Sequence, residues 1–273
     1  MRMRGWAGWH SWTMAPDDSS DPSDDPGEQP QSRPPMSAAG ASAGSAYLVS
    51  PDGGNAGPGV LVLHSWWGLN RGIKEVTERL AAAGFTAMAP DLFGGTELTD
   101  PTDPIQAAMR LAGVDVDATA GLILASIMAL RAHSADPQAP VGVLGFSMGA
   151  SWALWAAGRQ PDSVGAVVAY YGHQDMDFEG LAAPVLCHFA ELDPLVSEDQ
   201  AVQMQAHIRL VGGSFQSTTH PGTRHFFAES GVPVMGADGA VGERGVVEEV
   251  AEATAWEQTV EFLRRHAHER SVG

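Results

Sequence analysis

One serine stands in a pattern that could make it a nucleophile. Ser147 is the centre of residues 145–149, which read Gly-Phe-Ser-Met-Gly and match G-x-S-x-G. A buried strand is expected just before it, at 141–144, and a helix just after it, at 150–157. In that context the glycines permit a sharp turn that lifts the serine above the sheet, near the positive end of the helix. Because a free serine is a poor nucleophile, this hypothesis requires a base and a group that orients the base.

An acid and a histidine follow the serine along the chain. Asp193 comes after an expected strand at 184–189, and His225 comes after another at 214–219. The order serine, acid, histidine is the one used with a strand–turn–helix nucleophile, and each partner lies in a loop after a later strand. The sequence therefore predicts that Ser147, Asp193 and His225 form a nucleophilic triad.

Two neighbouring residues could take the same roles. Glu191 lies in the loop of the candidate acid and His220 in the loop of the candidate histidine, so loop geometry decides between them. His188 is expected within a strand and His207 within a helix, where hydrogen-bonded structural histidines are the commoner outcome. No H-E-x-x-H segment or Cys/His cluster has metal-ligand spacing, so the sequence predicts no metal site.

Negative charge that develops on a substrate carbonyl oxygen needs two backbone N–H donors. Met148 supplies the first by its position after the nucleophile. The second is expected from the loop 64–70, which follows the strand at 60–63, and we assign it to the N–H of Trp66. The other residues expected to shape a substrate pocket are Ser65, Trp67, Phe93, Arg110 and Tyr171.

The elements that must position these residues alternate between strands and helices. From Ala46 onward, apolar runs bounded by glycine and proline alternate with stretches of helical period, which predicts an α/β fold with a mostly parallel sheet and helices on both faces. The clearest buried strands are expected at 60–64, 86–89, 141–144, 165–170 and 184–189, and the clearest helical faces at 73–83, 123–130 and 250–263.

Composition limits the classes of protein that the chain could be. The net charge of −18 disfavours binding to nucleic acid or to anionic lipid. The single cysteine, Cys187, excludes an intramolecular disulfide and favours a cytoplasmic location. Neither a signal-peptide core nor an apolar run of about 20 residues is evident, so no membrane attachment is predicted, and nothing indicates an oligomeric state.

The first part of the chain differs in composition from the rest. Residues 1–43 are rich in proline, serine, aspartate and glycine and poor in aliphatic residues, which predicts a disordered N-terminal tail. Met36 could be the true start of the protein. Residues 44–273 are then expected to form one domain of a size that can bury a full core.

From Ala46 to His266 the chain resembles the dienelactone hydrolase family. The resemblance is carried by residues 46–48, 60–70, 84–95, 145–149 and 225–227, together with Pro51 and Asp193. It implies a compact α/β-hydrolase fold without a large cap domain, activity on small esters or lactones, and no cofactor.

Three positions depart from that family's pattern. The family's usual nucleophile is cysteine, where this chain has Ser147, and its usual glutamate beside the thiol is replaced by Ser65. These two changes agree, because a thiolate is controlled through its ionisation whereas a serine relies on general-base activation. The family's arginine four residues beyond the histidine is replaced by Glu229, which argues against an anionic dienelactone as substrate. Arg110 or Arg224 could still supply a cationic contact.

The chain is accordingly expected to be a serine hydrolase that cleaves carboxylic esters or lactones of a small soluble substrate. The alternative is a catalytically silent α/β-hydrolase that acts as a binding or regulatory module, since fold and family do not guarantee activity. A peptidase or acyltransferase would need a further cap or carrier-binding surface, for which 273 residues leave little room. The glycine-rich stretch 231–245 is interpreted as either a mobile rim or a plain surface loop.

Overall fold

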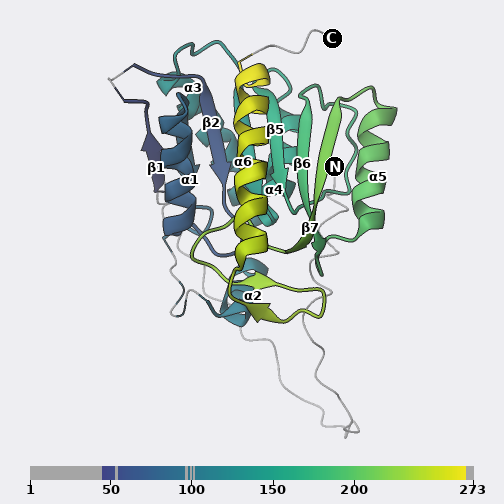
Figure 1. Ribbon diagram of the computed structural model, residues 1–273. Coiled ribbons are helices and arrows are strands. Elements are labelled where there is room, and N and C mark those ends of the chain that lie inside the picture. The colour runs from purple at the N-terminus through teal and green to yellow at the C-terminus, as the bar shows by residue number, and fades with distance from the viewer. Residues whose placement is uncertain (1–44, 53–54, 96–97, 99, 101, 269–273) are drawn as a thin grey trace, which may run out of the picture.

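The chain folds around a seven-stranded sheet with helices on both faces (Figure 1). The computed structural model describes residues 45–52, 55–95, 98, 100 and 102–268, so the predicted tail and Met36 lie outside the described residues. The strand order is β1-β3-β2-β4-β5-β6-β7, with β1 antiparallel to β3 and all other neighbours parallel. The strands are β1 (Ala46–Val49), β2 (Gly59–Leu63), β3 (Thr86–Pro90), β4 (Val141–Phe146), β5 (Val164–Tyr170), β6 (Val185–Leu192) and β7 (Phe215–Arg224). The predicted α/β-hydrolase fold is confirmed.

Two groups of helices cover the sheet. One face carries α1 (Arg71–Ala82) and α6 (Val246–His266), and the other carries α3 (Val116–His133), α4 (Met148–Arg159) and α5 (Glu198–Leu210) (Figure 1). Side chains alternate along each strand, so a central strand must be apolar throughout to serve both faces. All five residues of β2 are buried. Two separate apolar cores result, one on each side of the sheet.

Two small elements lie beyond the carboxyl ends of the parallel strands. They are α2 (Pro104–Ala112) and a hairpin of β8 (Val234–Met235) and β9 (Val241–Gly242) (Figure 1). The hairpin occupies the glycine-rich stretch for which the sequence left a mobile rim and a plain loop open. Both elements are therefore placed where ligands bind in open α/β sheets.

The apolar helix α3 packs on the core with part of its surface. By length and composition alone it could cross a membrane. Its buried residues Ile123, Ile127 and Leu130 belong to the apolar core on one face of the sheet, and α3 packs against β2, β3 and α4. A core helix of this kind has the same composition as a short membrane span.

Candidate active site

The turn between β4 and α4 holds Ser147 in a strained backbone conformation. Its φ of 51° and ψ of −114° lie in a region that residues with a Cβ rarely adopt. The turn is also too tight for larger neighbours. A Cβ on Gly145 would lie 2.2 Å from the carbonyl oxygen of Gly149, and one on Gly149 would lie 2.1 Å from that of Leu63. Both glycines of the motif are thus required sterically, and they bring the serine against the end of β2.

A hydrogen-bonded chain runs from Ser147 to Asp193. The Oγ atom of Ser147 lies 2.8 Å from Nε2 of His225, and Nδ1 of His225 lies 2.7 Å from Oδ2 of Asp193. Because a carboxylate only accepts, Nδ1 carries the proton and Nε2 is left to accept from the serine hydroxyl. The other oxygen of Asp193 accepts from the N–H groups of Leu195 and Val196, which fixes the carboxylate. This is the arrangement in which an imidazole can take a proton from serine.

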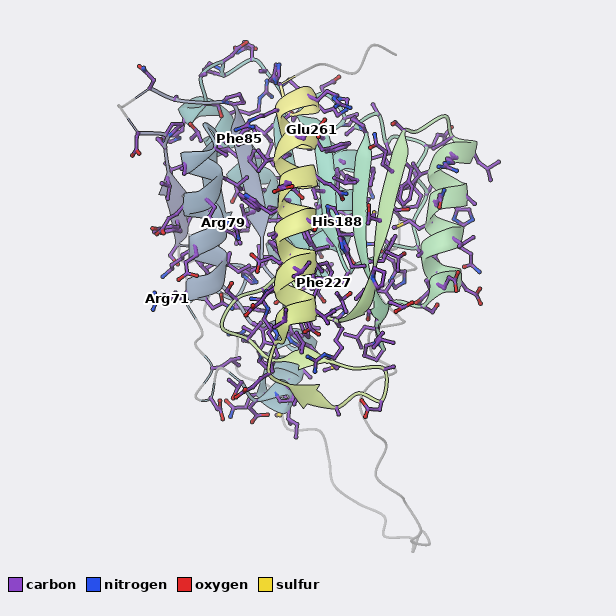
Figure 2. The ribbon with its side chains drawn as sticks, in the orientation of Figure 1. Arg71, Arg79, Phe85, His188, Phe227 and Glu261 are labelled. Atoms are coloured by element: carbon purple, nitrogen blue, oxygen red, sulfur yellow. The ribbon has the colours of Figure 1, made fainter. Side chains whose placement is uncertain are left out.

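The rival acid and histidine have other partners. Glu191 is exposed and accepts a hydrogen bond from the N–H of Gly222 at 2.7 Å. Nε2 of His220 instead lies 3.2 Å from Nδ1 of His188. The other ring nitrogen of His188, Nε2, is hydrogen-bonded to Oγ1 of Thr259 in α6. Figure 2 shows His188 and Phe227 next to α6, and both residues are buried. Burial lowers the pKa of His188 to about 3, which keeps it neutral and marks it as structural.

Two aromatic side chains pack against the imidazole of His225, and a third packs on one of them. The ring of Phe226 is 4.2 Å from it and that of Tyr171 is 4.9 Å from it, centre to centre, and Trp66 packs on Phe226 at 5.5 Å. Phe226 and Tyr171 have positive φ values of 69° and 38°. They and Ser147 are the non-glycine residues of the described chain with positive φ, so the backbone strain gathers around this one site.

The peptide that joins Ser65 to Trp66 has a fixed direction. The carbonyl of Ser65 accepts from Nδ1 of His64 at 2.7 Å and from the N–H of Gly68 at 3.1 Å. In a trans peptide the N–H points away from the C=O, so these two bonds also set the direction of the Trp66 N–H. His64 is completely buried, its Nε2 accepts from the N–H of Leu92, and burial lowers its pKa to about 4.

The other expected donor, the N–H of Met148, belongs to the helix that follows the nucleophile. Met148 is the first residue of α4, and the first N–H groups of a helix have no partner within it. Such N–H groups favour a negatively charged ligand. The loop of Trp66 follows β2 and Met148 follows β4, so the two expected donors come after neighbouring parallel strands of the sheet.

Arg110 of α2 holds the loop that carries Trp66. Its Nη2 donates to the carbonyl of Trp66 at 2.5 Å, and its guanidinium stacks on Phe93 at 4.1 Å from the ring centre. Gly68, with φ of 81°, leaves room for this guanidinium, since a Cβ there would lie 3.0 Å from Nη2. The proposed pocket residues Phe93 and Arg110 therefore pack together, and the arginine contacts protein backbone at the position where a substrate contact was expected.

A carboxylate that the sequence analysis did not place lies beside Ser65. The Oγ of Ser65 donates to Oε2 of Glu229 at 2.6 Å, and the hydroxyl of Tyr171 donates to Oε1 at 3.1 Å. Burial raises the pKa of Glu229 to about 7, although both hydrogen bonds oppose that shift. The family's glutamate at position 65 is replaced by Ser65, and Glu229 brings a carboxylate to this serine from a segment distant in sequence. The available signal was an acidic residue directly after the apolar run Phe-Phe-Ala at 226–228.

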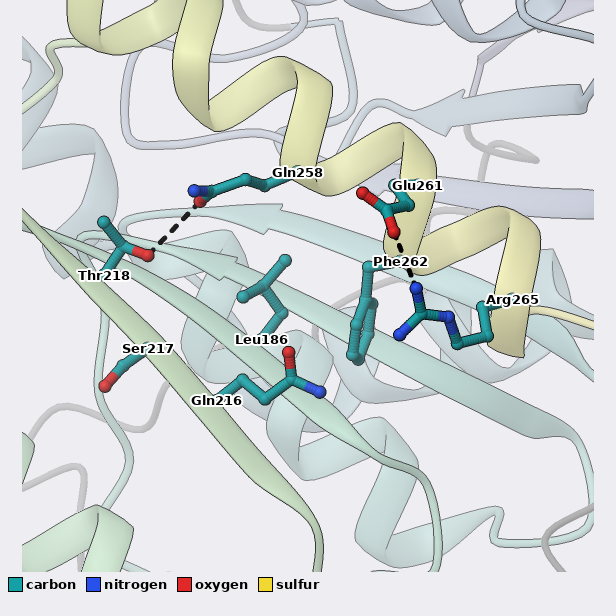
Figure 3. A pocket seen from close by; sticks show the side chains of 8 residues that line it. All are labelled: Leu186, Gln216, Ser217, Thr218, Gln258, Glu261, Phe262 and Arg265. Atoms are coloured by element: carbon teal, nitrogen blue, oxygen red, sulfur yellow. Dashed lines mark hydrogen bonds and ion pairs between the residues drawn. The ribbon is translucent and has the colours of Figure 1, made fainter.

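A pocket elsewhere on the sheet is separate from these residues. It lies between β6, β7 and α6 and is lined by residues that include Leu186, Gln216, Gln258 and Arg265 (Figure 3). Its lining residues on β7 belong to the first half of that strand, whereas His225 follows the strand's carboxyl end. None of its lining residues is a predicted site residue.

The fold, together with a serine on a strained turn between a parallel strand and a helix, places the chain among the α/β-hydrolases. More narrowly, the chain belongs to the dienelactone hydrolase family, whose model matches residues 45–267. Protein usf of Aquifex pyrophilus is 30% identical over 187 residues, which cover 66% of this chain and 80% of that protein. The carboxymethylenebutenolidase of Rhodococcus opacus is 24% identical over 233 residues, which cover 81% of this chain and 86% of that enzyme.

Solved structures show the same fold. A dienelactone hydrolase-like promiscuous phosphotriesterase from metagenomic libraries matches with a TM-score of 0.68 and 22% identity, over 82% of this chain and 92% of that one. An esterase from Thermogutta terrifontis matches with a TM-score of 0.58 and 16% identity, over 81% and 86% of the two chains. The chain is therefore a hydrolase of the dienelactone hydrolase family.

Proposed function

We propose that this protein is a serine esterase or lactonase that acts on a small soluble substrate. The observation that carries the proposal is the continuous hydrogen-bonded chain of Ser147, His225 and Asp193, with distances of 2.8 and 2.7 Å. These distances are within the range in which an imidazole activates a serine. The side chains of His225 and Asp193 are 1% and 2% exposed, so the charge pair that forms during reaction is shielded from water.

In the acylation step, Ser147 Oγ attacks the substrate carbonyl carbon while Nε2 of His225 takes the hydroxyl proton. Asp193 holds the imidazole in the required tautomer and stabilises the imidazolium. The oxyanion accepts hydrogen bonds from the N–H groups of Trp66 and Met148. His225 then returns the proton to the leaving alcohol oxygen, which departs from an ester and stays attached to the acyl chain of a lactone.

Deacylation repeats these roles with water as the nucleophile. His225 removes a proton from water, the water oxygen attacks the acyl carbon, and the proton passes to Ser147 Oγ as it leaves. No cofactor is required by this sequence of steps.

The charges near the site favour an uncharged acyl group. Glu229 stands where an arginine was expected from the family resemblance, and Arg110 binds the carbonyl of Trp66. A carboxylate on the substrate would find no arginine at position 229 and would approach a protein of net charge −18. We therefore propose neutral short-chain esters or lactones as the preferred class of substrate. The single cysteine, Cys187, supports a cytoplasmic place of action, which we also propose.

The test is hydrolysis of short-chain p-nitrophenyl esters, simple lactones and a p-nitrophenyl phosphotriester by the purified protein. Ser147→Ala and His225→Ala are expected to lose at least about 10³-fold in kcat while unfolding at an unchanged temperature. Ser134→Ala is the matched control, because Ser134 is also buried and hydrogen-bonded but caps the distant helix α3. Activity retained by Ser147→Ala would overturn the mechanism. Absence of turnover on every substrate would overturn the proposal and favour a silent binding module.

A further inference from the structure

Glu229 is a buried acidic residue that takes no part in the chemical steps proposed above. It is 1% exposed. Burial of a carboxylate is costly unless its oxygens accept hydrogen bonds, so a retained buried acid requires an explanation. Here both oxygens are used, one by Ser65 and one by Tyr171.

The hydroxyl of Ser65 has a defined polarity. Its oxygen accepts from the N–H of Trp67 at 3.2 Å, which leaves its single proton to be donated elsewhere. The acceptor is Oε2 of Glu229 at 2.6 Å, a short distance typical of a hydrogen bond to a carboxylate. The serine side chain thus connects the acid to the two peptides that flank Trp66.

Tyr171 connects the same acid to the nucleophile and the histidine. Its hydroxyl donates to Oε1 of Glu229, and its ring packs against the imidazole of His225. The residue before it, Tyr170, accepts a hydrogen bond from the N–H of Ser147 at 2.9 Å through its backbone carbonyl. Glu229 itself belongs to the turn after His225, where its N–H bonds the carbonyl of Phe226 at 3.0 Å.

We propose that Glu229 is a positioning residue for the hydrolysis, and that through Ser65 it holds the Trp66 N–H in place to stabilise the oxyanion. This inference rests on the proposed function. A single carboxylate connects the segment of the histidine, the segment of the oxyanion donor and the turn beside the nucleophile. An apolar side chain of equal size would leave the hydroxyls of Ser65 and Tyr171 without this acceptor, and the loop of the donor peptide would lose one of the bonds that hold it.

Variants of Glu229 and Ser65 can distinguish the loss of the hydrogen-bond acceptor from the loss of the negative charge. Glu229→Gln keeps an oxygen that can accept from Ser65, and we expect its kcat to stay within about 3-fold of the wild-type value. Glu229→Leu and Ser65→Ala remove that bond, and we expect kcat to fall by about 10-fold to 100-fold with little change in KM. A trifluoromethyl ketone, which binds as a tetrahedral oxyanion, should lose affinity by the same factor. The double variant Ser65→Ala with Glu229→Leu should lose less than the product of the two single losses, because the two changes share the bond between Ser65 and Glu229.

Two matched controls test whether any buried hydroxyl has this effect. Thr77→Val removes a buried hydroxyl that donates to the carbonyl of Ile73 within α1. Ser134→Ala removes a buried serine hydroxyl far from the elbow. Both are expected to keep kcat and the affinity for the ketone. An equal loss in either control, additive losses in the double variant, or a loss confined to KM would overturn the inference.

Amide hydrogen exchange tests how firmly the loop of Trp66 is held without a measurement of turnover. The N–H groups of residues 65–70 are expected to exchange at least about 10-fold faster in Glu229→Leu than in the wild-type protein, while those of α3 are unchanged. Wild-type turnover that depends on Ser147, with unchanged exchange in Glu229→Leu, would overturn the inference and leave the proposed function intact. Faster exchange in a protein without any turnover would overturn the proposed function, and with it the catalytic role of Glu229.

Discussion

The backbone of His225 is paired with that of Met235 through two hydrogen bonds, of 3.0 Å from the N–H of His225 and 3.1 Å from the N–H of Met235. The β8–β9 hairpin therefore fixes the main chain of the histidine, and Asp193 fixes its ring. The arrangement makes the hairpin a structural support of the site, because the position of a general base within a fraction of an ångström determines the rate.

Met235→Pro is expected to lower kcat by about 10-fold to 100-fold, since proline has no N–H to donate to the carbonyl of His225. Ala237→Pro is the matched control in the same hairpin. Ala237 is the second residue of a turn in which the N–H of Gly239 bonds the carbonyl of Gly236, and proline is favoured at that position. Steady-state kinetics on one ester would decide, and equal losses in both variants would mean that any change to the hairpin disturbs the site.

Arg110→Lys is expected to lower kcat by about 5-fold to 10-fold, because lysine replaces neither the planar stack on Phe93 nor the directed bond to the carbonyl of Trp66. The ratio of KM for an anionic ester to KM for a neutral ester should not change. A selective rise in KM for the anionic ester would instead show that the arginine binds a substrate carboxylate. Arg131→Lys is the control, since Arg131 also donates to backbone carbonyls but lies on the far part of α3.

Much of the sheet could be predicted because its central strands are buried on both faces and read as continuous apolar runs. The carboxyl end of β7 could not be predicted. Residues 220–224 look like a loop because they contain Pro221 and Gly222, yet they continue the strand to Arg224. β7 is an edge strand and its pairing with β6 shifts register near Ala190, and both conditions allow a proline within a strand.

The residues of the site also differ in whether the sequence could predict them. Ser147 and His225 could be proposed from a local motif and from chain order, which are properties of the sequence itself. The bond between Ser65 and Glu229 joins residues 164 positions apart and depends on the packing of the whole domain. Local patterns contain no information about such a contact, and the same holds for the pairing of His225 with Met235.

Gly149→Ala is expected to lower the free energy of unfolding by about 3 kcal/mol and to abolish most activity, because its Cβ would lie 2.1 Å from the carbonyl oxygen of Leu63. Gly121→Ala is the contrasting control. Gly121 is exposed within α3 and a Cβ there meets nothing within 4 Å, so alanine should raise the free energy of unfolding by about 0.5 to 1 kcal/mol. Urea denaturation measures both changes.

Two buried histidines should make the fold sensitive to acid. Burial lowers the pKa of His64 to about 4 and that of His188 to about 3, from an ordinary value of 6.5. Between pH 6.5 and these values the unfolded chain binds protons that the folded chain does not, so stability falls as the pH falls. Each histidine contributes about 1.4 kcal/mol per pH unit in that window.

The check for this prediction is urea denaturation at pH 7 and pH 5. In His188→Leu the difference in unfolding free energy between the two pH values should shrink by about 2 kcal/mol relative to the wild-type protein. Thr259→Val changes a partner of His188 without removing a titratable group, so its pH difference should match the wild type. An unchanged difference in His188→Leu would contradict the assignment of a buried, neutral histidine.

Glu229 should produce the opposite dependence. Burial raises its pKa from 4.5 to about 7, so between these values the folded protein binds a proton that the unfolded chain has lost, and stability falls as the pH rises. Glu229→Gln carries no charge and should exceed the wild type in unfolding free energy by about 3 kcal/mol at pH 8, with the excess vanishing near pH 4.5.

Glu248 supplies a control of opposite sign for that measurement. Burial works against its charge, but the hydrogen bonds from Arg224 and from the N–H of Gly245 outweigh burial and lower its pKa. Its charged form therefore stabilises the fold above its ordinary pKa, and Glu248→Gln should destabilise the protein at pH 8 and approach the wild type as the pH falls below 4.5. If Glu229→Gln also destabilised the protein at pH 8, the carboxylate beside Ser65 would be a net stabilising charge, and burial would not be what governs its pKa.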